Sequence, residues 1–193
     1  MRPDKITVHC SASNWGDDQI IKQWHTDPKY HNNGKVTYQG RKYQSKDELP
    51  VFFRRNPHRR GNGWLDTGYH AIICNGYPDY TSWARRKPKK SYDGLIQPGR
   101  SETQTGAHVG GHNRNNLGIC CIGIDKFTEN QFNSLTIWLL DRMEKYSIPH
   151  SMVLGHNEYP GHESRGCPNI DMQDLRLKLR SGIIKPVSPV LTW

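Results

Sequence analysis

The stretch Leu117-Gly118-Ile119-Cys120-Cys121-Ile122-Gly123-Ile124 (LGICCIGI) is a continuous apolar run about as long as one β-strand. A strand with one face in water alternates apolar and polar residues, whereas a strand that is apolar at every position is covered on both faces. The run therefore predicts a strand at the centre of a sheet.

Other strands and helices are predicted on both sides of this run. Apolar and strand-forming segments predict four further strands. Capping residues followed by apolar positions at steps of three or four predict three helices. The strands are expected at Lys5–Cys10, Tyr69–Cys74, Tyr92–Gln97 and Ser151–Leu154, and the helices from Asn14–Asp18 to Pro28, from Thr128 to Pro149 and from Asp171 to Gly182. Because strands and helices interleave, the predicted class is α/β, a single domain with a central mixed β-sheet flanked by helices.

Two segments do not fit this pattern. From about Tyr30 to Gly63 the chain is polar, basic and aromatic without a sustained period, which predicts a long insertion or lid. Residues 183–193 contain Pro186 and Pro189 and are expected to form an extended tail. The expected organisation is one domain over residues 1–182, with a basic insertion at about 30–63, and a tail over 183–193.

Charge and hydropathy limit the partners. The mean hydropathy is -0.86, and no apolar run approaches the roughly 18 residues of a membrane span, so no membrane insertion is expected. No signal peptide precedes the first strand, which predicts synthesis in the cytoplasm. The net charge of +9 favours acidic polymers. The basic tracts Arg54–Arg60 and Arg85–Lys90 are typical of solvated loops, and no recognised motif predicts a nucleic-acid partner.

Five cysteines are an odd number without the dense spacing of a disulfide scaffold. Cys10, Cys74, Cys120 and Cys121 lie in apolar segments and are expected to be reduced core residues. Cys167 instead lies in a loop rich in Gly and Pro.

That loop, Gly155–Pro168 (GHNEYPGHESRGCP), raises the question of a metal site. Zinc in a catalytic site takes three ligands from His, Cys or carboxylates. His156 follows a predicted strand, Cys167 comes eleven positions later, and His9 ends another strand. Ends of strands commonly converge at one edge of a sheet. With ten histidines in the chain, however, spacing alone leaves other ligand sets, or no metal, open.

Four motifs in order decide the resemblance: HCSAS from His9, GWLDTGYH from Gly63, GAH from Gly106 followed by Asn113 and LGI, and His156 followed by Cys167-Pro168. Together they resemble the zinc N-acetylmuramoyl-L-alanine amidases, the family of bacteriophage T7 lysozyme, with peptidoglycan recognition proteins as more distant relatives. The likeness to T7 lysozyme is the stronger one, and the motifs cover the chain from about residue 5 to 180.

The resemblance implies a mixed sheet flanked by helices, with a zinc cleft on one face. One zinc ion would be held by His9, His156 and Cys167, with His162 as a bystander. Arg165 stands where T7 lysozyme and many relatives have a lysine, so it could stabilise negative charge but not shuttle a proton. The remaining implied roles are a catalytic hydroxyl at Tyr69, substrate contacts at His108 and Asn113, and, from strand alternation, a structural role for His70.

The function implied by the resemblance is hydrolysis of the amide between N-acetylmuramic acid and the L-alanine of the stem peptide. The expected partner is peptidoglycan and the expected state is a monomer. The expected biological role is that of a phage or prophage endolysin, which collects in the host cytoplasm before release. The alternatives are a peptidoglycan-binding module without activity, disfavoured by the presence of Cys167 and Tyr69, and a regulator that binds another protein such as a phage RNA polymerase.

Overall fold

The computed structural model describes residues 1–182, which form two compact units. The first unit joins Met1–Asp17 to residues 69–182, and the second is Asp18–Gly68. The tail expected over 183–193 lies outside the described residues.

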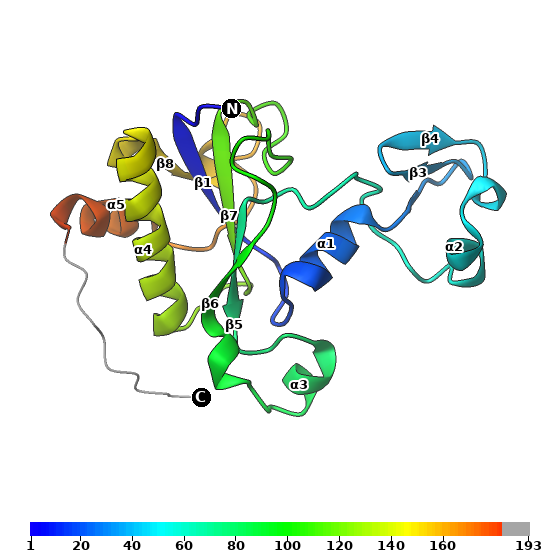
Figure 1. The fold of residues 1–193 in the computed structure, drawn as a ribbon, viewed down its shortest axis with the longest axis horizontal. Coiled ribbons are helices and arrows are strands. Elements are labelled where there is room, and N and C mark those ends of the chain that lie inside the picture. The colour runs from blue at the N-terminus through cyan, green and yellow to red at the C-terminus, as the bar shows by residue number, and fades with distance from the viewer. Residues whose placement is uncertain (183–193) are drawn as a thin grey trace. The chain divides into compact units, whose positions relative to one another are not determined.

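The first unit contains a five-stranded sheet in the order β6-β5-β7-β1-β8 (Figure 1). Strands β1, β7 and β8 are parallel to one another and to β5, whereas β5 and β6 are antiparallel, so the predicted mixed sheet is confirmed. Strand β7 occupies the middle, and all six of its residues are buried, as its unbroken apolar sequence predicts. The strands are β1 (Lys5–Cys10), β5 (Ala71–Asn75), β6 (Asp93–Pro98), β7 (Asn116–Cys121) and β8 (Val153–Gly155).

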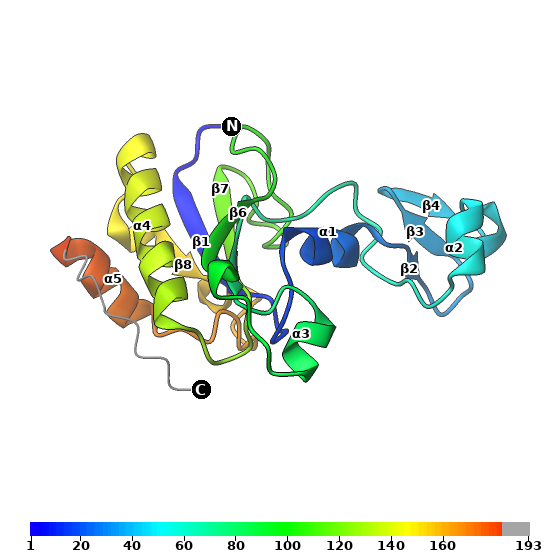
Figure 2. The ribbon, with the colours of Figure 1, turned by 60° about the horizontal axis from the view of Figure 1, so that its bottom comes forward.

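Helices α4 (Glu129–Tyr146) and α5 (Met172–Ser181) pack on one face of this sheet (Figure 2). Alternate residues of β1, β5 and β7 face them, and these side chains form the core together with Leu135, Leu139 and Leu175. Because side chains alternate along a strand, the residues between them point to the other face. In β1, Ile6 and Val8 join the helical core, so His9 points to the opposite face.

The ends of these helices are set by the residues that predict them. The Thr128 hydroxyl accepts a hydrogen bond from the Gln131 N–H at 3.1 Å, which completes the expected capping box. Asp171 accepts from the first turn of α5, and Gly182 ends that helix with a left-handed backbone. The remaining short helices of this unit are α3 (Tyr80–Ala84), η2 (Lys90–Tyr92), η3 (His150–Met152) and η4 (His156–Glu158).

The second unit has more regular structure than its sequence predicts. An antiparallel sheet in the order β2-β3-β4 occupies the start of the segment that was predicted only as a long insertion or lid. Its strands have only two or three residues, too few to produce a visible alternation in sequence. The elements are α1 (Asp18–Thr26), β2 (Lys29–Tyr30), β3 (Val36–Tyr38), β4 (Arg41–Tyr43), η1 (Lys46–Glu48) and α2 (Val51–Arg55).

A partly buried ion pair stabilises the second unit. Arg59 donates two hydrogen bonds to the Asp27 carboxylate, at 2.6 and 3.0 Å, and the Asp27 residue is 3 % exposed. The unit extends beyond the insertion expected at about 30–63, because α1 and the chain up to Gly68 belong to it. The domain boundaries expected from sequence remain a prediction. Over residues 1–182 no helix is long and apolar enough to cross a membrane.

Candidate metal centre and active site

The three expected metal ligands meet at one edge of the five-stranded sheet. His9 lies at the end of β1, and His156 directly follows β8, the parallel neighbour of β1. Parallel neighbours end at the same edge, which brings the two imidazoles to a centroid distance of 4.6 Å. Cys167 reaches the same place from the loop before α5, and one ligand atom from each of the three side chains lies within 4.8 Å of the others.

The Cys167 sulfur is held by the backbone of β1. The Cys10 N–H donates to Cys167 Sγ at 3.3 Å, and His9 Nδ1 lies 3.6 Å from the same sulfur. The Cys10 thiol also hydrogen-bonds to Cys167, which lowers the pKa of Cys10 to about 7 and raises that of Cys167.

A second histidine fixes the orientation of His9. His9 Nε2 lies 3.1 Å from His108 Nδ1, and His108 Nε2 lies 3.2 Å from the Asn116 carbonyl oxygen. A carbonyl only accepts, so His108 Nε2 carries a proton. Burial lowers the pKa of His108 to about 3, so its Nδ1 is an acceptor, and His9 Nε2 donates to it. The lone pair of His9 is then on Nδ1, the atom that lies 3.6 Å from Cys167 Sγ.

The His108 ring fits only because a glycine lies beneath it. A Cβ atom at Gly118 would lie 2.6 Å from His108 Cδ2, closer than carbon atoms can approach. His108 is buried, and both of its ring nitrogens are engaged inside the protein. Its position therefore suits the support of His9 better than the substrate contact expected from sequence.

His156 has a matching partner in His162. His156 Nε2 lies 3.1 Å from His162 Nδ1, and His162 Nε2 lies 3.0 Å from the Gly110 carbonyl oxygen. A carbonyl only accepts, so His162 Nε2 donates to Gly110, and His162 Nδ1 accepts from Arg165 Nε and from His156 Nε2. The lone pair of His156 is then on Nδ1. Burial, and then the Arg165 charge, lower the pKa of His156 to about 4, so the ring is neutral at neutral pH. His162 thus contacts an expected ligand rather than standing apart.

Arg165 lies at the exposed side of this pair. Its Nε donates to His162 Nδ1 at 3.1 Å, and its backbone N–H donates to the His162 carbonyl at 3.0 Å. The guanidinium is exposed, so a permanent positive charge stands beside the opening of the site.

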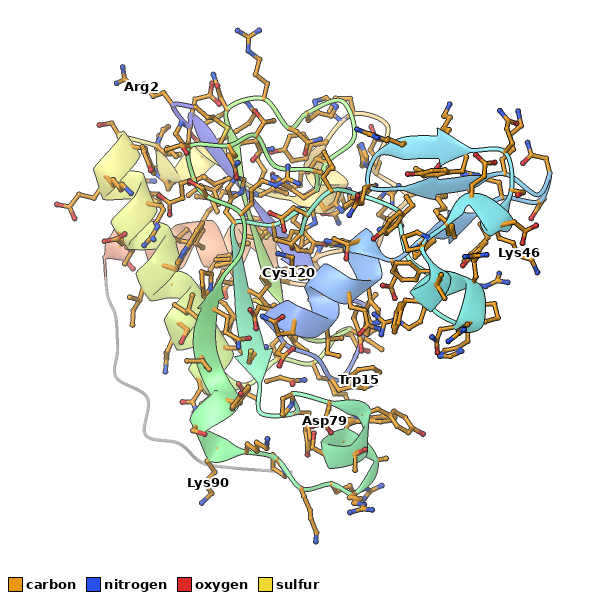
Figure 3. The ribbon with its side chains drawn as sticks, turned by 45° about the vertical axis from the view of Figure 1, so that its right-hand side comes forward. Arg2, Trp15, Lys46, Asp79, Lys90 and Cys120 are labelled. Carbon is orange, nitrogen blue, oxygen red and sulfur yellow. The ribbon has the colours of Figure 1, made fainter. Side chains whose placement is uncertain are left out.

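Tyr69 lies on the other side of His9. The two ring centroids are 5.0 Å apart. The Tyr69 hydroxyl hydrogen-bonds to the thiol of Cys120 in β7. Cys120 is labelled in Figure 3. Burial around the hydroxyl, followed by the nearby thiols, raises the pKa of Tyr69 well above its usual value. The phenol is therefore a hydrogen-bond donor at neutral pH, and the residue as a whole is half-buried.

Asn113 and His70 shape the backbone around the site. Asn113 Oδ1 accepts from the N–H groups of His108 and Val109, each at 2.9 Å, so it holds the loop that presents His108. His70 Nδ1 accepts from the Gly118 N–H at 2.9 Å, and its Nε2 lies 3.0 Å from the Gln104 carbonyl. His70 thus has the structural position expected for it.

The residues around the centre suit a thiophilic divalent metal. His9 is 1 % exposed and His156 is 9 % exposed, so the ligands are shielded except on one side, where Cys167 is partly exposed. Two neutral imidazoles and one thiolate are the donor set preferred by zinc and are unsuited to magnesium or calcium. Both imidazoles also have the second hydrogen-bond partner that metal-binding histidines usually have.

Comparison with known proteins assigns the family. The model of the N-acetylmuramoyl-L-alanine amidase family matches residues 1–170. The chain belongs to this family. It is 31% identical over 181 residues to the endolysin of Enterobacteria phage T3, covering 88% of this chain and 83% of that protein. It is 26% identical over 181 residues to the endolysin of Escherichia phage T7, with the same shares covered.

A solved structure supports the amidase fold. The N-acetylmuramoyl-L-alanine amidase LysC from Clostridium intestinale URNW is similar with a TM-score of 0.56 at 20% identity, covering 93% of this chain and 87% of that one. The chain is thus a phage-type peptidoglycan amidase by family, and its His9, His156 and Cys167 side chains form a group able to hold a metal.

The hydrogen bonds that support the site of this amidase were not predicted from its sequence. The role of His162 depends on the loop bringing residues 156 and 162 together, which no spacing rule predicts. Glu158 holds the same loop, because it accepts from the Gly155 N–H and forms two hydrogen bonds of 2.8 Å with Arg176 in α5. The one signal in the sequence for this contact was the presence of His162 six positions after the expected ligand His156.

Proposed function

We propose that this amidase hydrolyses the bond between N-acetylmuramic acid and L-alanine with one zinc ion held by His9, His156 and Cys167. The observation that carries the proposal is the convergence of these three ligand atoms within 4.8 Å. Zinc in such a site polarises an amide carbonyl and lowers the pKa of water toward about 7. Spacing alone left other ligand sets open, whereas the geometry brings this one together.

The residues around the ligands have separate roles in this proposal. His108 accepts a hydrogen bond from His9 Nε2, and His162 accepts one from His156 Nε2. These contacts direct the Nδ1 atoms of both ligands to the metal. The protonated Tyr69 hydroxyl is a donor for the oxygen that gains negative charge during hydrolysis. Arg165 stabilises that charge from the open side without exchanging a proton.

The phage relatives are named endolysins, and we assign this protein the same biological setting. In that setting it is made in the host cytoplasm, works as a monomer and reaches peptidoglycan after release. The net charge of +9 favours attachment to an anionic wall.

The test is digestion of purified peptidoglycan, with mass spectrometry of the released fragments. The isolated protein, the chelated protein and the protein with zinc restored are compared. We expect free stem peptides that begin with L-alanine, their loss after chelation and their recovery with zinc.

Two variants make this test specific. Cys167→Ala removes a proposed ligand and is expected to lower both zinc content and turnover by orders of magnitude, whereas Cys74→Ala removes a buried thiol of β5 and is expected to keep both. A folded, zinc-loaded wild type that binds the wall without cutting it would instead identify a recognition module. Full activity in Cys167→Ala would exclude the proposed ligand set.

A further inference from the structure

The segment 76–92 between β5 and β6 is much longer than the pairing of these strands requires. The strands are antiparallel neighbours, with Asn75 paired to Asp93. Such strands can be joined by about two residues, and most connections in compact domains have about four to six. The connection between β5 and β6 is long enough to contain two helices, α3 and η2.

The segment is held in place by its own hydrogen bonds. Asp79 and Ser82 form a capping box at the start of α3, and the Lys89 N–H donates to the Gly76 carbonyl at 2.8 Å, which closes the base of the loop. The Gly16 N–H donates to the Tyr77 carbonyl, also at 2.8 Å, and so fixes the loop after β1 beside the segment. The surface that the segment carries is therefore structured.

Three aromatic rings lie together on this surface. The Tyr80 ring contacts Trp15 at a centroid distance of 5.9 Å and Trp83 at 5.8 Å. Figure 3 shows Trp15 next to the start of α3, where Asp79 is labelled. Tyr80 is 58% exposed and Trp83 is 37% exposed, although burial of such rings would stabilise the fold. Clustered exposed rings of this kind indicate a binding surface.

Five cations follow the rings directly. Each is exposed, and within residues 1–182 none of them takes part in a salt bridge, whereas Arg142 and Lys145 of α4 both pair with Glu102. Lys89 Nζ lies 5.5 Å from the centre of the Tyr92 ring, so one cation also faces an aromatic ring. The five are Arg85, Arg86, Lys87, Lys89 and Lys90.

We infer that this aromatic–basic surface, formed by Trp15, Tyr80, Trp83 and the cations of 85–90, binds peptidoglycan as a site additional to the metal centre. The C–H faces of sugar rings stack on the electron-rich faces of aromatic rings. Carboxylates of neighbouring stem peptides pair with the cations. The inference rests on the proposed function, because the polymer that this amidase cuts supplies both sugars and carboxylates. Single-stranded nucleic acid has a similar combination of flat rings and charge and is the rival occupant.

Two measurements on the same variants test the inference. Tyr80→Ala and the double variant Tyr80→Ala/Trp83→Ala are compared with wild type in sedimentation with purified, insoluble peptidoglycan and in hydrolysis of a short soluble muropeptide. Ile137→Ala and Leu177→Ala are matched controls, since they remove exposed apolar side chains of α4 and α5. We expect the double variant to bind insoluble peptidoglycan about tenfold more weakly. Its kcat/KM on the soluble muropeptide should equal that of wild type.

A charge variant adds a second readout. Lys87→Gln/Lys89→Gln/Lys90→Gln is expected to weaken binding at low salt and to flatten the decrease of binding with rising salt. Unchanged binding in both the aromatic and the charge variants would overturn the inference. Loss of binding only to a single-stranded oligonucleotide would overturn it in favour of the rival occupant. A wild type that binds through Trp83 and Tyr80 but cuts no muropeptide would contradict the proposed function and leave the binding surface supported.

Discussion

At the scale of single residues, the centre depends on two histidine pairs. His9 with His108 and His156 with His162 each end on a backbone carbonyl, so a proposed ligand is oriented by a second histidine in both cases. His162→Ala is therefore expected to lower zinc affinity by about 10- to 100-fold, the usual cost of removing such a partner. Competition with a chromophoric zinc chelator measures this.

The matched control is His150→Ala in η3, which removes a histidine away from the centre and should leave zinc affinity unchanged. His162→Gln is expected to retain much of the affinity, because its amide can accept from His156 and donate to Gly110. Equal zinc affinity in His162→Ala and wild type would return His162 to the bystander role expected from sequence.

At the scale of elements, the start of α4 connects the helix to the sheet. Gln131 closes the capping box with Thr128, and its Nε2 donates to the carbonyls of Ile73 and Ile122 at 3.2 and 2.9 Å. Thr128→Ala is expected to lower the free energy of unfolding by about 1 kcal/mol, the typical cost of losing a capping hydroxyl. Urea denaturation measures the change.

Thr136→Ala is the control within the same helix, because that hydroxyl donates only to the Phe132 carbonyl on the exposed side. It should cost less than Thr128→Ala. Equal effects of the two substitutions would show that the capping box does not determine the stability of this helix.

At the scale of the whole molecule, the second unit can be tested by deletion. The Gly61 N–H donates to the Pro28 carbonyl at 3.0 Å, so residues 29–60 can be removed and the ends rejoined. The removed segment contains nine Lys and Arg residues and two acidic residues. Asp27→Asn accompanies the deletion, since Asp27 loses Arg59 as its partner. We expect zinc content to be retained, because the ligands lie in the first unit, and binding to peptidoglycan to fall at moderate salt.

Full wall binding by the shortened protein would show that the segment is a tolerated insertion, since long loops add little closure cost. Loss of zinc would show instead that the segment supports the fold of the centre. The variant is compared with full-length Asp27→Asn, which separates the effect of the deletion from that of the substitution.

Local chemistry explains which elements could be predicted from sequence. The apolar run at Leu117, the capping box at Thr128 and the cap at Asp171 each act within a few residues, and the structure has the strand and both helices there. The strands β2, β3 and β4 were not predicted, because two- or three-residue strands depend on pairing with their neighbours rather than on their own pattern.

The sequence by itself determined the α/β class, the central strand and, through its ordered motifs, the candidate ligands His9, His156 and Cys167. Only the tertiary structure decided how those ligands are oriented and which exposed rings and cations lie together on one surface. The reason is physical: strand and helix signals arise from neighbours along the chain. A hydrogen bond such as that between His9 and His108, 99 positions apart, exists only after β1, β7 and the loop before β7 have packed.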